Sequence, residues 1–244
     1  MRYNFKQPNP QFKTAPFRGG MPGWKRNIDL IGCVAALPLL LLCTLVMWIL
    51  SWLISPGPVF FCQERVGHRG KRFKIYKFRT MFTGADTRVH QAHFKQLMQS
   101  NTPMVKLDSR RDARLIPGAW LLRASGLDEL PQLINVLRGE MSIVGPRPCL
   151  PAENESYLPH QRERLNAVPG LTGLWQVSGK NRTTFEEMIR LDIHYSRHLA
   201  LVTDVRIILT TLPALLIQIV DTHRLRKTAK PAAPGVPANL GSPS

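Results

Sequence analysis

An uncharged apolar segment near the N-terminus constrains the fold of this chain more than any other feature. Residues 31–54 contain no charged side chain over 24 positions. A straight helix of that length reaches about 36 Å at roughly 1.5 Å per residue, enough to cross a hydrocarbon core of about 30 Å. A core helix of a soluble domain is not expected to be apolar on every side over such a length. The sequence therefore predicts a membrane helix over residues 25–56.

The charges around this helix leave its topology open. Lys25 and Arg26 precede it, and four basic residues follow it at a short distance: Arg65, Arg69, Lys71 and Arg72. Because Lys and Arg gather on the cytoplasmic side of membrane helices, basic residues at both ends can be explained by a re-entrant helix with two cytoplasmic ends. Pro38 supplies a bend, since proline removes a backbone hydrogen bond and clashes with the preceding turn. A spanning helix kinked at Pro38 explains length and charge equally well.

The remaining chain divides into a domain and two tails. Residues 1–24 and 223–244 are polar or rich in Pro and Gly, and both are predicted to be disordered. Residues 57–222 have the mixed composition of a folded domain, which we expect to face the cytoplasm. The four cysteines show no metal-type or CxxC spacing, so we expect reduced thiols.

Local patterns predict an α+β domain that is mostly helical. Residues 58–81 alternate around a basic turn with two glycines, which indicates a β-hairpin. Helical apolar spacing is found over residues 113–123 and 130–138, where Leu130, Leu133, Ile134 and Leu137 share one face, and a further helix is expected over 184–198. The uncharged stretch 207–220 is too short to span a membrane, and we expect it to lie on the bilayer or to pack on the domain.

The net charge of +17 favours anionic partners such as nucleic acid, acidic lipid or phosphorylated substrates. Aromatic residues make up 8% of the chain and show no stacking pattern, so we expect no nucleic-acid partner. The seven histidines have no ligand spacing, and no Ser/His/Asp constellation is visible, which gives no support to a hydrolytic triad.

An adjacent carboxylate pair, Asp128-Glu129, is the strongest candidate for a chemical site. Acidic residues in a first helical turn are common because they complement the helix dipole. Here, however, three arginines lie close in sequence: Arg123, Arg138 and Arg147. Adjacent carboxylates repel each other unless cations offset their charge, and a divalent ion held by carboxylates commonly accompanies phosphate chemistry. The pattern therefore points to phosphoryl transfer assisted by a divalent ion.

Four further polar side chains are candidates either for the site or for structural contacts. Lys77 and Arg79, in the segment KFRTM, are either surface charges or phosphate contacts. Asp192 and Tyr195 lie three positions apart on the helix expected over 184–198, and we expect structural roles for both.

Five ordered motifs resemble the bacterial sugar transferases, the monotopic polyprenol-phosphate phosphoglycosyl transferases. They are KRNIDLIG, SPGPVFFCQERVG, FKIYKFRTM, LDELPQLINVLRGEMSIVGPRP and PGLTGLWQVSGKN. The resemblance runs from about residue 25 to residue 220, and with one apolar run upstream the chain is similar to the short form of the family. Members start the assembly of exopolysaccharide, capsule or glycoconjugate at the bacterial inner membrane.

The resemblance implies a two-step reaction of a UDP-sugar with undecaprenyl phosphate. Asp128 would attack the sugar-bearing phosphate, release UMP and hold the sugar phosphate covalently until the lipid phosphate takes it. Glu129 would help to hold Mg²⁺, and Arg123 and Arg147 match positions close to the phosphates. It also implies a re-entrant membrane helix, contact with membrane lipid, and downstream glycosyltransferases as further partners.

A non-catalytic alternative comes from the composition alone. A membrane-tethered basic protein that binds acidic lipid or nucleic acid has the same net charge and the same apolar run. It does not explain why an acidic pair is set among arginines, and the sequence therefore favours the enzyme.

Overall fold

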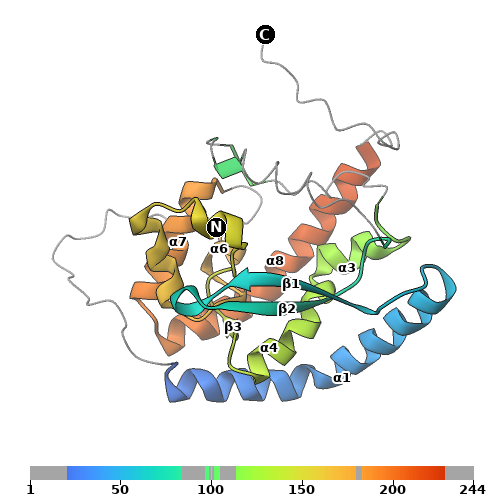
Figure 1. The fold of residues 1–244 in the computed structure, drawn as a ribbon, viewed down its shortest axis with the longest axis horizontal. Coiled ribbons are helices and arrows are strands. Elements are labelled where there is room, and N and C mark those ends of the chain that lie inside the picture. The colour runs from blue at the N-terminus through green and yellow to red at the C-terminus, as the bar shows by residue number, and fades with distance from the viewer. Residues whose placement is uncertain are drawn as a thin grey trace, which may run out of the picture.

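The computed structural model describes residues 21–83, 97–98, 100, 102–104, 114–179 and 183–228. Its first elements are α1 (Gly23–Leu53), β1 (Phe60–Val66), the 3-10 turn η1 (His68–Gly70), β2 (Arg72–Phe78), α3 (Ala119–Ser125), the 3-10 segment η3 (Leu127–Gln132) and α4 (Leu133–Leu137). They are followed by β3 (Ser142–Val144), α5 (Pro151–Glu155), the 3-10 segment η4 (Pro159–Asn166), β4 (Gly170–Thr172), α6 (Leu174–Val177), α7 (Phe185–Arg197) and α8 (Leu201–Thr228) (Figure 1). The mostly helical α+β fold with a hairpin is confirmed. The tails predicted over 1–24 and 223–244 fall mainly outside the described residues.

The N-terminal apolar helix is confirmed, and it contacts the domain along one face only. Its buried residues recur about every four positions at each end: Lys25, Asp29, Cys33, Cys43, Met47 and Ser51. The other faces expose apolar side chains, with Val34 70% and Trp52 76% exposed. Water does not favour such a surface, so it fits a lipid environment.

Both ends of α1 are attached to the same domain. At the start, Lys25 Nζ lies 2.6 Å from Asp204 Oδ2 of α8, and Arg26 donates to the carbonyl oxygens of Val136 and Leu137. Just beyond the end, Ser55 accepts hydrogen bonds from the Arg79 guanidinium. Figure 1 shows α1 running beside the domain and changing direction between its two halves. Pro38 lies inside the helix.

Strands β1 and β2 form the expected antiparallel hairpin, with Phe61 opposite Lys77 and Arg65 opposite Phe73. Asn135 of α4, which is fully buried, completes the outer edge of β2. Its side-chain amide donates to the Lys74 carbonyl oxygen at 2.7 Å, and its oxygen accepts from the Tyr76 N–H at 3.3 Å. The hairpin is thereby fixed to α4 through its backbone.

The motifs VGPRP and PGLTG meet as the parallel strands β3 and β4. Gly145 N–H donates to the Thr172 carbonyl oxygen at 2.8 Å, and Gly170 N–H donates to the Pro146 carbonyl oxygen at 2.9 Å. A Cβ at Gly145 would lie 2.2 Å from the Val168 carbonyl oxygen. This close approach of two backbones explains why glycine is required at that position.

Of the three helices expected in the domain, one is confirmed and two differ from the structure in part. The helix predicted over 113–123 begins at Ala119, because Pro117 and Gly118, with a φ of 81°, interrupt the chain there. The helix predicted over 184–198 is confirmed as α7, capped by the Thr184 side chain. In α4, Leu137 is 49% exposed while Val136 is fully buried, so the predicted apolar face was wrong at that position.

The C-terminal helix α8 is longer than expected, with 28 residues. It continues to Thr228, so residues 223–228 are helical rather than part of a disordered tail. His223 lies against the Trp120 ring of α3, at 5.9 Å between ring centroids, and Arg226 lies 5.1 Å from the Trp120 ring centroid. The helix packs on α3 and α6 and still exposes Val202, Leu209 and Leu212. By length and composition, α1 and α8 are both long and apolar enough to cross a membrane.

Candidate active site

The acidic pair lies in the 3-10 segment η3, not at the start of a regular α-helix as expected. Gly126, with a φ of 74°, turns the chain sharply after α3, and its carbonyl oxygen accepts from the Glu129 N–H at 3.0 Å. Pro131 has no N–H to donate within this segment, so regular α-helix begins only at Leu133. Asp128 is 7% exposed, which places its carboxylate at a sheltered position beside the hairpin.

Lys77 of β2 is brought to this pair. Its Nζ lies 2.6 Å from Glu129 Oε1, and both side chains are partly exposed. The β2 strand and η3 are in extensive contact, so the ion pair sits at the junction between the hairpin and the acidic turn. The side chain predicted as a phosphate contact therefore lies next to the predicted chemical site.

Arg123 approaches the same end of β2 from α3. Its guanidinium donates to Thr80 Oγ1 at 3.0 Å, three residues beyond Lys77. Arg138 lies further along, where it donates to the Tyr76 hydroxyl at 2.8 Å and stacks over the Tyr76 ring. Arg123, which precedes the acidic pair in sequence, thus contacts the chain just after β2, and Arg138, which follows the pair, contacts β2 itself.

Arg79 lies beside the segment that follows α1. It is buried, and its guanidinium binds the Ser55 carbonyl oxygen, the Ser55 hydroxyl and the Pro56 carbonyl oxygen. These contacts hold the segment that follows α1, and within the described residues none of them joins Arg79 to the acidic pair. A phosphate contact stays a prediction for this side chain.

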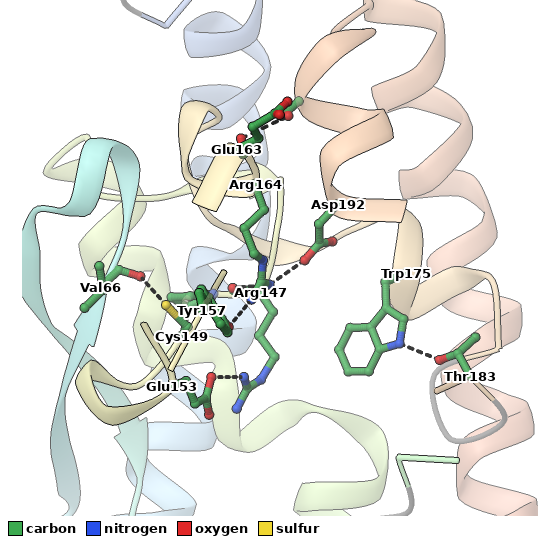
Figure 2. A network of polar contacts seen from close by, with 12 residues as sticks. Val66, Arg147, Cys149, Glu153, Tyr157, Glu163, Arg164, Trp175, Thr183 and Asp192 are labelled. Carbon is green, nitrogen blue, oxygen red and sulfur yellow. Dashed lines mark hydrogen bonds and ion pairs between the residues drawn. The ribbon is translucent and has the colours of Figure 1, made fainter. Parts of the chain in front are cut away.

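Arg147 is held in a polar network beside the hairpin (Figure 2). Its guanidinium lies 3.2 Å from Glu153 Oε2, and its carbonyl oxygen accepts from Arg164 at 2.9 Å. Arg164 is fully buried and is paired with Asp192, while the Tyr157 hydroxyl accepts from it at 2.6 Å. Asp192 therefore positions the backbone of Arg147 through Arg164, which is the structural role expected for it.

Tyr195 also has the structural role expected for it. Its hydroxyl donates to Asp204 Oδ1 at 2.7 Å, beside the ammonium group of Lys25. Burial and the Asp204 carboxylate hold the pKa of this hydroxyl well above its usual value, so it stays protonated and serves as a donor. The group joins α7, α8 and the start of α1.

Arg65 lies near both Arg147 and the acidic pair, although in the sequence it was considered only for the topology of the membrane helix. It lies on β1, is 8% exposed, and its pKa is lowered to about 10 by burial and by the neighbouring Arg147, against the opposing effects of Glu153 and Glu129. The Arg147 network and the acidic pair therefore both act on the same guanidinium. A signal in the sequence could have identified it. Side chains alternate between the two faces of a hairpin strand, and this alternation places Arg65 on one face together with Phe73.

The donor set at the acidic pair suits Mg²⁺. Among the described residues no cluster of three or more His, Cys, Asp or Glu side chains has metal-binding geometry. Mg²⁺ in phosphoryl-transfer sites, however, is commonly held by one or two carboxylates together with substrate phosphates and water. Two adjacent carboxylates, Asp128 and Glu129, meet that requirement, and Glu129 is also ion-paired with Lys77.

Comparison with known proteins identifies the family. A family model described as bacterial sugar transferase matches residues 21–218. The chain belongs to the bacterial sugar transferase family, and the expectation of a sugar transferase enzyme is confirmed at that level.

Several curated relatives share this region. The exopolysaccharide production protein ExoY of Sinorhizobium fredii is 40% identical over 78% of this chain and 84% of its own length. The UDP-glucose:undecaprenyl-phosphate glucose-1-phosphate transferase of Caulobacter vibrioides is 40% identical over 79% of this chain and 69% of its own length. The undecaprenyl-phosphate galactose phosphotransferase of Salmonella typhimurium is 34% identical over 79% of this chain. The chain spans 40% of that protein and 42% of the galactosyl transferase CpsE of Streptococcus agalactiae.

Proposed function

We propose that this protein transfers a sugar phosphate from a UDP-sugar to undecaprenyl phosphate, with release of UMP. The observation that carries the proposal is the acidic turn: a sheltered Asp128 beside a Glu129 that is ion-paired with Lys77. Relatives named as undecaprenyl-phosphate sugar phosphotransferases support the same substrates for this chain. The reaction is the first membrane step of exopolysaccharide or glycoconjugate synthesis, and its product serves downstream glycosyltransferases.

Two displacements at one phosphorus atom make up the reaction. In the first, an Asp128 carboxylate oxygen attacks the β-phosphorus of the UDP-sugar, and the bond from that phosphorus to the bridging oxygen breaks, so that UMP leaves. In the second, a phosphate oxygen of undecaprenyl phosphate attacks the same phosphorus and the aspartyl bond breaks. The products are a polyprenyl diphosphosugar and the free carboxylate of Asp128.

Cations make the first displacement possible. A carboxylate and a phosphate oxygen that each carry one charge repel by about 1 kcal/mol at 4 Å in water, and by about 4 kcal/mol at an effective dielectric constant of 20. Several such pairs oppose the approach of Asp128 to a diphosphate. Lys77 and Arg123 lie at the end of β2 where this repulsion must be offset. Mg²⁺, held by Asp128 and Glu129, would neutralise further charge on the diphosphate.

The membrane helix brings the site to the lipid acceptor. Both ends of α1 are tied to one domain, through Lys25 with Asp204 and through Ser55 with Arg79, which supports a re-entrant helix with both ends in the cytoplasm. The enzyme then sits in the cytoplasmic face of the bacterial inner membrane. Each CH₂ group of a polyprenyl tail kept in an apolar environment is worth about 0.8 kcal/mol, so the lipid substrate is met without being extracted.

The experiment that tests the proposal measures UMP release in detergent with undecaprenyl phosphate and a panel of UDP-sugars. UDP-glucose and UDP-galactose come first, because relatives carry glucose and galactose in their names. We expect release that depends on the lipid acceptor for continued turnover, and loss of turnover in Asp128→Asn. Full activity of Asp128→Asn would refute the role of Asp128.

A further inference from the structure

Arg65 is a buried cation with fewer partners than its chemistry requires. A guanidinium carries five N–H donors. One donates to Gln63 Oε1 at 2.7 Å and one reaches the Pro148 carbonyl oxygen at 3.4 Å, while the buried Nε has no acceptor. Among the described residues, three of these donors therefore have no acceptor, the buried Nε–H being one of them, and no carboxylate forms an ion pair with Arg65. Buried unmatched donors are costly unless a ligand satisfies them.

Neighbouring arginines do not share this deficit. Arg147 is paired with Glu153, and Arg164 is paired with Asp192 (Figure 2). The charge at Arg65 is the one in this group for which the described residues provide no carboxylate within ion-pair distance. A bound anion would supply what the protein does not.

Arg65 lies between two parts of the candidate site, the network around Arg147 and the acidic turn. The Val66 N–H donates to the Cys149 carbonyl oxygen at 2.8 Å, which pairs the end of β1 with the chain just after Arg147. On the other side, the register of the hairpin puts Arg65 and Lys77 on the same face, and Lys77 contacts Glu129. The free donors of Arg65 thus lie between Arg147 and the acidic turn.

We propose that Arg65 is a substrate-binding residue whose ligand is a phosphate group. The inference rests on the proposed function, which brings two kinds of phosphate to this site: the diphosphate of the sugar donor and the monophosphate of the lipid acceptor. A phosphate offers several acceptor oxygens in the geometry that a guanidinium fork matches, and such charge-assisted bonds are stronger than neutral ones. Arg65 and Arg147 then hold the anion from one side while Lys77 faces it from the other.

Equilibrium binding in detergent tests the proposal with two probes, UDP for the donor and farnesyl phosphate for the acceptor. We expect Arg65→Gln to weaken at least one probe by about tenfold or more, with Arg65→Lys intermediate. The matched control is Arg72→Gln on the same hairpin, because Arg72 is exposed and we expect a change below about twofold. Weaker UDP binding assigns the ligand to the donor, and weaker farnesyl phosphate binding assigns it to the acceptor.

A second variant covers the case in which Arg65→Gln does not fold. Gln63→Glu keeps the shape of the side chain that already accepts from Arg65, and it adds the missing carboxylate. We expect this variant to keep the fold and its affinity for the same probe to fall by about tenfold, because the new carboxylate competes for the guanidinium. Cys62→Glu is the control, since it adds the same charge at the exposed neighbouring position on the opposite face of β1.

The outcomes separate this inference from the proposed function. If folded Arg65→Gln and Gln63→Glu proteins bind both probes within twofold of the wild type, the inference is overturned; it is also overturned if the wild type binds neither probe. If the wild type binds a probe through Arg65 but releases no UMP from any UDP-sugar, the proposed function fails and the phosphate site stands. If the wild type releases UMP but probe binding does not depend on Arg65, the proposed function stands and the phosphate site at Arg65 fails.

Discussion

Lys77 Nζ and Glu129 Oε1 lie 2.6 Å apart, although 52 positions separate the two residues in the chain. The contact joins the β-hairpin to the turn that carries both carboxylates. Lys77 is thereby held against Glu129, and the neighbouring Asp128 is the more buried of the two carboxylates. In the proposed reaction this arrangement sets the charge at the acidic turn before the substrate arrives.

Replacing Lys77 by Met is expected to lower kcat/KM for the UDP-sugar by about tenfold or more, because a charge-assisted contact beside the reacting phosphate is lost. Steady-state UMP release measures the effect. Lys74→Met is the matched control, since Lys74 lies on the same strand with an exposed side chain, and we expect it to stay within about twofold. Equal activities of the two variants would contradict the role given to Lys77.

Asp204→Ala is expected to destabilise the folded protein by about 3 kcal/mol, because it leaves the buried Lys25 ammonium without its carboxylate. Unfolding in detergent, followed by circular dichroism, measures the change. The comparison is Glu64→Ala, which breaks an exposed pair with Arg72 and should cost less than about 1 kcal/mol. Similar losses for both variants would show that the contact between α1 and α8 adds little.

Gly145→Ala is expected to destabilise the domain by about 3 kcal/mol, because the added Cβ would meet the Val168 carbonyl oxygen at 2.2 Å. The same unfolding measurement applies. Gly23→Ala provides the control, since a Cβ there meets nothing within 4 Å. A tolerated alanine at Gly145 would mean that β3 and β4 do not approach each other as closely as described.

The topology of α1 is expected to be re-entrant. Single cysteines at Gly23 and Arg69, introduced after the four native cysteines are replaced by Ala, are both expected to react with an impermeant maleimide from the cytoplasmic face. Inside-out and right-side-out vesicles distinguish the two faces. Labelling of the two positions from opposite faces would establish a spanning helix instead.

Strong local patterns were sufficient to predict several elements. The hairpin followed from the residues that flank a glycine-containing basic turn, α7 was expected over nearly the residues it occupies, and α1 followed from its lack of charge. In each case the residues that indicate the element lie within one short stretch of sequence. The acidic pair with Arg123 nearby was also visible, because the residues lie within a few positions of one another.

Features that depend on distant segments could not be predicted in this way. The 3-10 form of η3 depends on Gly126 and Pro131 acting together, and the helical residues 223–228 depend on packing against Trp120. Arg79 was considered either a surface charge or a phosphate contact, and its burial against the segment after α1 could not be predicted because Ser55 lies 24 positions away in the chain. Arg65 gains its significance from two segments that the chain brings together only after folding.

A trapping experiment on Asp128 tests the central claim most directly. The enzyme is incubated with a UDP-sugar labelled at the β-phosphate, without lipid acceptor, and the peptide that contains Asp128 is analysed by mass spectrometry. We expect a labelled, hydroxylamine-sensitive sugar phosphate on Asp128, with release of about one UMP per enzyme, and loss of the label when undecaprenyl phosphate is added. An unmodified peptide, with UMP formed only when donor and acceptor are present together, would contradict a covalent aspartyl intermediate.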